Sequence, residues 1–166
     1  MAVRFTCTKC GETHEGLPDI GFDAPVFAEE MGAGAGGARI RLTSDFCEID
    51  GRYFFVRCVL PVPVLGEAEP FGWGVWMSAG EATFRRYAEL FERDEEGTMA
   101  PWAGYLSNRL PAYENTVGLI GRIRPRGEGI RPLVELEPTS HLLAVHQRDG
   151  MPLSFIQGVV EPLLHR

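Results

Sequence analysis

Apolar and polar side chains alternate most clearly along residues 46–60, on either side of Asp50-Gly51. Alternation with a period of two predicts half-buried β-strands, and an Asp-Gly pair favours a two-residue type I′ turn between them. In that register residue 49 faces residue 52, and one face of the hairpin is almost entirely apolar. The residues of that face are Cys47, Ile49, Phe54, Val56, Cys58 and Leu60. We therefore expect an antiparallel hairpin whose two cysteines point to the same side.

Other spacings of apolar residues predict the remaining elements. The strongest helical pattern spans residues 80–92, where apolar side chains recur every three or four positions. Ser78 and Glu81 have the spacing of a capping box at its start. The other expected strands cover residues 71–77, 116–123 and 133–137, and the other expected helices cover residues 140–148 and 156–163. This order predicts an α+β fold, an antiparallel sheet with helices packed on one face.

A chain of 166 residues fits one domain, so residues 1–166 are expected to fold together. Residues 1–17 are expected to form a zinc-knuckle-like Cys/His arm of two short strands, and residues 31–38 a glycine-rich flexible connector. The connector formally matches the G-x-G-x-x-G pattern of dinucleotide-binding folds. That pattern needs a buried strand before it and a helix after it, and neither is expected here. We therefore interpret the segment as a linker.

The formal net charge of −7 limits the partners to expect. An acidic surface repels phosphate groups, so nucleic acid is not an expected partner, whereas a protein or a small molecule is. No apolar segment reaches the length of a membrane span, and the residues before the first cysteine do not resemble a secretion signal. We expect a cytoplasmic protein whose four cysteines serve as metal ligands, redox groups or core residues in a reducing compartment.

The most specific chemical pattern is Cys7-x-x-Cys10-Gly11-x-x-His14. Two intervening residues let both thiolates of a tight turn point at one ion, and a glycine after the second cysteine permits the left-handed backbone of a zinc knuckle. Three further residues return the chain so that the histidine reaches the same point. Zinc prefers four tetrahedral ligands. The sequence therefore predicts a zinc site with Cys7, Cys10 and His14 as local ligands.

The fourth ligand stays open, since Cys47, Cys58, another histidine or water would each complete the site. Taken singly, both hairpin cysteines are better explained as small core residues. They lie four residues apart along the expected ladder, roughly 13 Å at strand rise, so at most one of them joins the ion. Between the two, Cys47 is favoured. A fourth protein ligand would make the site structural, whereas water would leave it open for catalysis.

Two other interpretations of the Cys7/Cys10 pair remain. A redox dithiol opens a helix whose N-terminus lowers the thiol pKa, and Gly11 and Thr13 make a poor helix start. Alternatively, both cysteines are plain reduced thiols, because only a single Cys-x-x-Cys pair is present.

Weaker patterns mark a few further residues. The possible functional cluster outside the arm consists of Asp45, His141, Gln147 and Arg148. No nucleophile or carboxylate stands at a diagnostic spacing from His141, so a hydrogen-bonded structural histidine is the favoured interpretation of that residue. The segment 104–109 has the character of a loop at the edge of a site, without a mechanism attached to it. The aromatic segment 71–76 fits a core strand better than a ligand platform.

Several of these motifs occur together, in one order, in a known family. They are Cys7-x-x-Cys10-Gly11-x-x-His14-x-Gly16-Leu17-Pro18, Leu42-Thr43-Ser44-Asp45-Phe46-Cys47, Trp73-Gly74-Val75-Trp76 and His141-x-x-Ala144-x-x-Gln147-Arg148-x-Gly150. With them the chain resembles the bacterial family called domain of unknown function 2199, from residue 7 to about residue 150. Leu142 departs from the family pattern, which often has proline there. The family has no assigned activity, so the resemblance implies no catalytic residue.

The leading hypothesis is a zinc-stapled binding or interaction domain, because no acid–base or nucleophile constellation accompanies the ligand cluster. The alternative is a metal-dependent, hydrolase-like enzyme in which Asp45 or His141 approaches an open zinc position. The acidic charge would also suit a protein that neutralises a basic partner.

Overall fold

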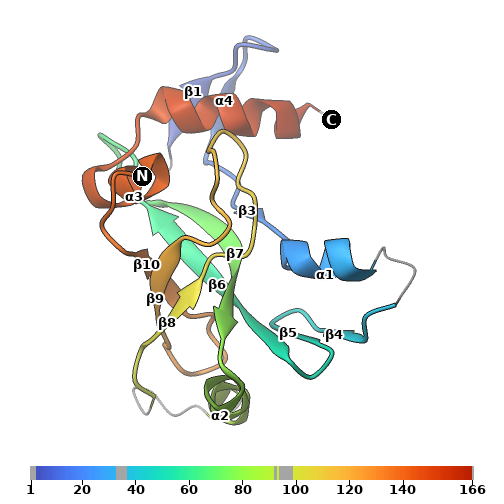
Figure 1. Ribbon diagram of the computed structural model, residues 1–166. Coiled ribbons are helices and arrows are strands. Elements are labelled where there is room, and N and C mark those ends of the chain that lie inside the picture. The colour runs from blue at the N-terminus through green and yellow to red at the C-terminus, as the bar shows by residue number, and fades with distance from the viewer. Residues whose placement is uncertain (1–2, 33–36, 92, 94–98, 166) are drawn as a thin grey trace.

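The computed structural model describes residues 3–32, 37–91, 93 and 99–165, and it forms a mixed α+β fold (Figure 1). The elements in chain order are β1 (Arg4–Thr6), β2 (Thr13–Glu15), β3 (Ile20–Gly21), α1 (Val26–Gly32), β4 (Ile40–Leu42), β5 (Phe46–Ile49), β6 (Tyr53–Val62), β7 (Phe71–Ala79), α2 (Glu81–Phe91), β8 (Trp102–Tyr105), β9 (Ile120–Arg124), β10 (Leu133–Leu136), α3 (Leu142–Asp149) and α4 (Leu153–Leu164). The α+β class expected from the sequence is confirmed. Within these ranges no helix has the length and apolar character that crossing a membrane requires.

The hairpin of β5 and β6 differs in register from the expected one. Asp50 and Gly51 both have positive φ, 54° and 62°, as an Asp-Gly turn favours. However, Ile49 pairs with Tyr53, so Arg52 is one more residue in the connection. A shift of one residue moves every side chain of a strand to the other face. Cys47 and Ile49 therefore point away from the face that carries Cys58.

The main sheet closes on itself. β6 pairs with β7 along one edge and with β10 along the other, and β9 and β8 follow β10. Leu106, directly after β8, then bridges to Met77 of β7. Strands β7, β6, β10, β9 and β8 thus form a small barrel-like ring. The β6–β10 and β3–β7 pairings are parallel, which makes the sheet mixed rather than purely antiparallel.

Two apolar clusters lie on opposite sides of β6 and β7. The larger one contains the alternate residues Val56 to Val62 of β6 and buried residues of α2, α3 and α4. The smaller one contains Cys47, Phe55 and Trp76, and it is covered by α1. Buried residues of α2, α3 and α4 thus belong to one cluster, with α2 at one end of the barrel and α3 and α4 at the other (Figure 1). Because α1 covers the smaller cluster, the helices do not all pack on one face. Trp73 and Trp76 are fully buried, so the aromatic strand is a core strand.

The ends of the helices differ from those expected from the sequence. The Ser78 hydroxyl accepts a hydrogen bond from the Tyr105 N–H and does not cap α2, whose first turn is closed by Phe84 N–H donating to the Gly80 carbonyl. α4 runs through Gly158 and Pro162. Of the expected connector, residue 32 ends α1, and residues 33–36 lie outside the described part of the chain.

Gln147 joins α3 to two strands, and its replacement by glutamate should destabilise the fold. Its amide oxygen accepts from Leu136 N–H at 2.7 Å, and its amide nitrogen donates to the carbonyls of Pro61 and Val134 at 3.0 and 2.9 Å. A carboxylate cannot donate and would face two carbonyl oxygens, so we expect Gln147→Glu to cost about 2 kcal/mol. Urea unfolding monitored by tryptophan fluorescence measures this loss. The exposed neighbour is the control, since Arg148→Ala should change stability by less than about 0.5 kcal/mol.

Candidate metal centre

The arm is a two-stranded hairpin, β1 and β2, separate from the main sheet. The turn between its strands has the backbone of a knuckle, because Cys7 N–H donates to the Glu12 carbonyl and Gly11 N–H donates to the Cys7 carbonyl, each at 2.9 Å. Gly11 has φ 75°, the left-handed conformation expected at this glycine. The Lys9 N–H points at the Cys7 sulfur at 3.4 Å. This turn therefore presents both cysteines to one point.

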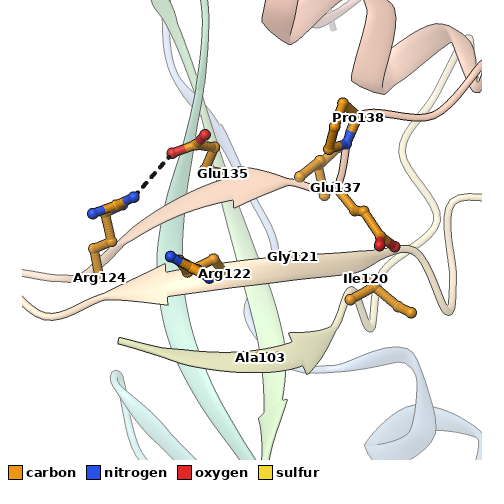
Figure 2. Close-up of a pocket in the computed structure, with 9 residues that line it drawn as sticks. Ala103, Ile120, Gly121, Arg122, Arg124, Glu135, Glu137 and Pro138 are labelled. Atoms are coloured by element: carbon orange, nitrogen blue, oxygen red, sulfur yellow. Dashed lines mark ion pairs between the residues drawn. The ribbon is translucent and has the colours of Figure 1, made fainter. Parts of the chain in front are cut away.

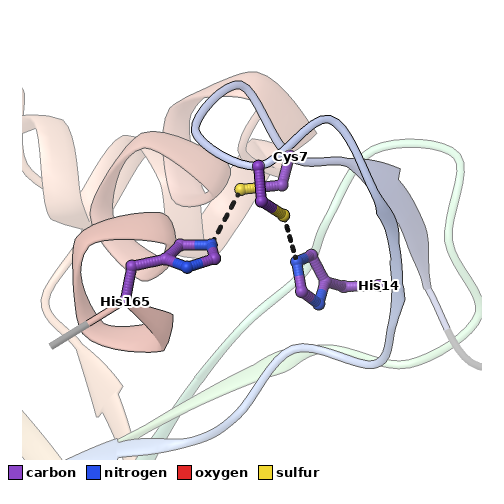
Figure 3. Close-up of side chains that lie close together, drawn as sticks. Cys7, His14 and His165 are labelled. Atoms are coloured by element: carbon purple, nitrogen blue, oxygen red, sulfur yellow. Dashed lines mark hydrogen bonds between the residues drawn. The ribbon is translucent and has the colours of Figure 1, made fainter.

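A fourth side chain reaches this point from the other end of the chain. His165 follows directly after α4, and Figure 3 shows its ring turned toward Cys7 while His14 approaches from the arm. Its Nε2 lies 3.2 Å from Cys7 Sγ, and His14 Nε2 lies 3.4 Å from Cys10 Sγ. One ligand atom from each of the four residues lies within 4.8 Å of the other three. The cluster is therefore a Cys2His2 set built from β2, the knuckle turn and the end of α4.

The spacing of these atoms fits a tetrahedral ion. Bonds of about 2.3 Å to sulfur and about 2.0 Å to nitrogen place tetrahedral ligand atoms roughly 3.3 to 3.8 Å apart. The two cysteine–histidine separations, 3.2 and 3.4 Å, are close to that range. Cys7 is buried, His14 is half-buried, and Cys10 and His165 are exposed. The cluster could thus hold a metal ion at the surface.

Cys47, favoured from the sequence as the fourth ligand, does not lie in this cluster. The register of the β5–β6 hairpin turns its side chain under α1, where it is fully buried beside Phe55 and Trp76. Cys58 is also fully buried, in the larger cluster on the other side of the sheet. Burial raises the pKa of the Cys47 thiol to about 11 and raises that of Cys58 further. Both hairpin cysteines are core residues, and His165 is the fourth member of the cluster.

α4 is fastened to the knuckle turn by Glu161. Its carboxylate accepts from the Thr8 N–H at 2.8 Å and from the Thr8 hydroxyl at 2.5 Å. Gln157 donates to the same carboxylate at 2.6 Å and to the Thr6 carbonyl at 2.8 Å. These bonds place the last turn of α4, and with it His165, over the cysteines.

The Glu161 contact should weaken in acid. Hydrogen bonds from the Thr8 hydroxyl, Gln157 and the Thr8 N–H lower the pKa of Glu161 from its ordinary 4.5 to about 2. The unfolded chain then binds this proton more tightly than the folded one, so the contribution is complete above about 4.5 and is lost as the pH falls toward about 2. Metal-free Glu161→Gln should melt below wild type at pH 6, and the gap should narrow by pH 3. A gap that stays constant between these pH values would contradict it.

The possible functional cluster does not assemble into one site. His141 caps α3 by accepting from the Leu143 N–H at 3.1 Å, and its Nε2 faces the Glu114 carbonyl at 2.5 Å. Gln147 bonds only strand backbone, and Arg148 lies by Asp149. Asp45 is ion-paired with Arg131 at 2.9 Å. In the described residues each of these groups has a structural partner, which agrees with the structural interpretation of His141.

The sequence did not single out His165 as the fourth residue of the Cys/His cluster. His165 stands 158 residues from Cys7, and no spacing rule connects positions so far apart. A weak signal was available, since His165 directly follows α4, which carries Gln157 and Glu161 on its last turns.

Comparison with known proteins identifies the family and nothing more specific. None of the curated proteins and none of the solved structures matches the chain. The model of one family matches residues 6–151, which covers the knuckle turn, the barrel and α3. The match ends before α4, so His165 lies outside it. The chain belongs to the family described as uncharacterized protein conserved in bacteria, domain of unknown function 2199.

Proposed function

We propose that this chain is a zinc-stapled binding domain, in which one zinc ion fastens the N-terminal arm to the end of α4. The observation that carries the proposal is the Cys7, Cys10, His14 and His165 cluster, with one ligand atom from each within 4.8 Å of the others. Two thiolates and two imidazoles in tetrahedral arrangement are a donor set that suits zinc. A magnesium or calcium ion would require oxygen ligands.

Apart from the hydrogen bonds of Thr6 and Thr8 to Gln157 and Glu161, few contacts hold the arm, so a metal staple would add to its stability. Its hairpin makes no strand pairing with the main sheet, and Val3, Phe5 and Cys7 are its buried apolar residues. A zinc ion would bridge Cys7 and His165, 158 residues apart. Closing so long a loop in the unfolded chain is entropically costly, so a bond that exists only in the folded state stabilises it.

Four protein ligands favour a structural role over catalysis. A catalytic zinc keeps one position for water or substrate, and in this proposal His165 fills it. Neither Asp45 nor His141, the residues that a hydrolase would use here, belongs to the cluster. The hydrolase-like alternative therefore requires His165 to leave the ion.

Elemental analysis of untagged, freshly purified protein tests the staple. About one zinc per chain is expected, and His165→Ala should lower the zinc affinity by 10-fold or more. Cys47→Ala and Cys58→Ala are the matched controls, because they remove thiols that lie in the core. Protein without zinc would refute the staple. Retention of full affinity by His165→Ala would instead favour a three-ligand, open site and lead to hydrolase assays.

A further inference from the structure

A concave site, separate from the Cys/His cluster, lies on the side of the sheet that α1 covers. It has a volume of about 440 Å³, which is within the range of small-molecule sites. Its walls are Phe27 and Met31 of α1, Phe55 of β6, and the two tyrosines Tyr53 and Tyr105. The tyrosines are 48% and 55% exposed, so their rings stand at the rim. We call this site the tyrosine groove.

The tyrosine groove is preformed by buried hydrogen bonds. The Asn108 amide donates to the Ala24 carbonyl at 2.9 Å, and its oxygen accepts from Trp76 N–H at 2.8 Å. The first residue of α1, Val26, donates its N–H to the Ser107 carbonyl at 2.8 Å. These contacts hold α1 against the segment that follows β8. Tyr105, Leu106 and Ser107 therefore form one wall of this groove.

The chemistry of the lining selects an uncharged ligand. None of the residues that line the groove is charged, so an ionic ligand would lose its hydration without gaining a partner. The aromatic walls offer flat faces for stacking. At the floor, the Ser78 hydroxyl accepts from Tyr105 N–H at 2.8 Å. Among the described residues this hydroxyl donates to no other group, so it can donate to a ligand oxygen or nitrogen.

The shallow depression over β8, β9 and β10 has the opposite character. Figure 2 shows Arg122, Arg124, Glu135 and Glu137 around it, with Arg124 and Glu135 paired at 3.5 Å. Its volume is about 340 Å³. Exposed side chains of both charges do not favour one class of ligand, so we do not propose this depression as a binding site.

We propose that the tyrosine groove binds a neutral aromatic small molecule, which packs against the rings of Tyr53 and Tyr105. The proposal places the ligand-binding site of the domain in this groove, and the family description names no such site. It does not depend on the zinc staple, because none of the four metal-site residues lines the groove.

Fluorescence titration with two matched probes tests the groove. N-phenyl-1-naphthylamine is neutral, and 1-anilinonaphthalene-8-sulfonate has the same rings with a negative charge. We expect the neutral probe to bind at least about 10-fold more tightly, and Tyr105→Ser to weaken its binding by about five-fold or more. Leu65→Ser, at a residue 56% exposed elsewhere on the surface, should leave binding unchanged.

Three outcomes would overturn the proposal. They are no binding of the neutral probe, an equal fall of its affinity in Tyr105→Ser and Leu65→Ser, and tighter binding of the charged probe than of the neutral one. The last would show that Arg52, 5.9 Å from the Tyr53 ring centroid, makes the groove an anion site. Repeating the titration after chelation separates the two proposals. Unchanged binding in zinc-free, folded protein is expected, whereas loss on chelation would contradict the independence of the groove.

Discussion

Replacing Cys10 by serine should abolish tight metal binding and lower the melting temperature to that of chelated wild type. Cys10 is exposed, so the change removes a ligand without opening a cavity. A metal that binds only the folded state stabilises it by about 4 kcal/mol when its free concentration is a thousand times Kd. For a domain of this size that corresponds to roughly 8 to 16 °C. Differential scanning fluorimetry with and without chelator measures it.

The matched control for Cys10→Ser lies one residue earlier in the same turn. Lys9 is exposed, and its backbone N–H, which points at Cys7 Sγ, is retained in Lys9→Ala. That variant should keep wild-type metal content and the full response to chelator. Limited proteolysis adds a local measurement, since Cys10→Ser should be cut first within residues 3–17. A wild-type melting temperature that does not respond to chelation would contradict the prediction.

Replacing Gly104 by alanine should destabilise the closure of the barrel. A Cβ atom at Gly104 would lie 2.2 Å from the Ser78 carbonyl oxygen and 3.0 Å from Ile123 Cδ1, so β8 would have to move away from β7. That movement strains the Tyr105 N–H bond to the Ser78 hydroxyl and the Ser107 N–H bond to the Trp76 carbonyl. Overpacking and weakened hydrogen bonds together should cost about 3 kcal/mol, measured by urea unfolding.

Replacing Gly158 by alanine should change the stability in the opposite direction. Gly158 lies inside α4, is exposed, and a Cβ atom there would meet no atom within 4 Å. Alanine reduces the freedom of the unfolded chain and favours the helix, so Gly158→Ala should stabilise by about 0.5 to 1 kcal/mol. If both variants changed stability equally, the close approach of β8 to β7 would not be the cause of the Gly104 effect.

Elements whose signal lies within a few residues followed from the sequence. The knuckle turn, the helix α2 and the strands β6, β7 and β10 depend on local spacing, because side-chain periodicity and turn chemistry act between near neighbours. The family resemblance likewise rested on short motifs, and the family match confirms it.

Short strands were harder to find. β3, with two residues, is too short for a period to show. β8, Trp102–Tyr105, has the sequence Trp-Ala-Gly-Tyr and therefore lacks the alternation of apolar and charged residues that marks β10. β8 exists because Gly104 allows close contact with β7, a contact that only the closed barrel creates. The hairpin register was wrong by one residue, because an Asp-Gly pair predicts the positive φ angles but not whether Arg52 joins the strand or the turn.

By itself, then, the sequence determined three members of the Cys2His2 cluster, the α+β class and the core strands, since each is encoded by residues close together in the chain. Tertiary structure alone decided the fourth member of the cluster, the place of Cys47 and the existence of the tyrosine groove. His165 reaches Cys7 across 158 residues because α4 packs on the barrel and Glu161 bonds the knuckle turn. Contacts between residues so far apart depend on the packing of the whole fold, which local spacing does not encode.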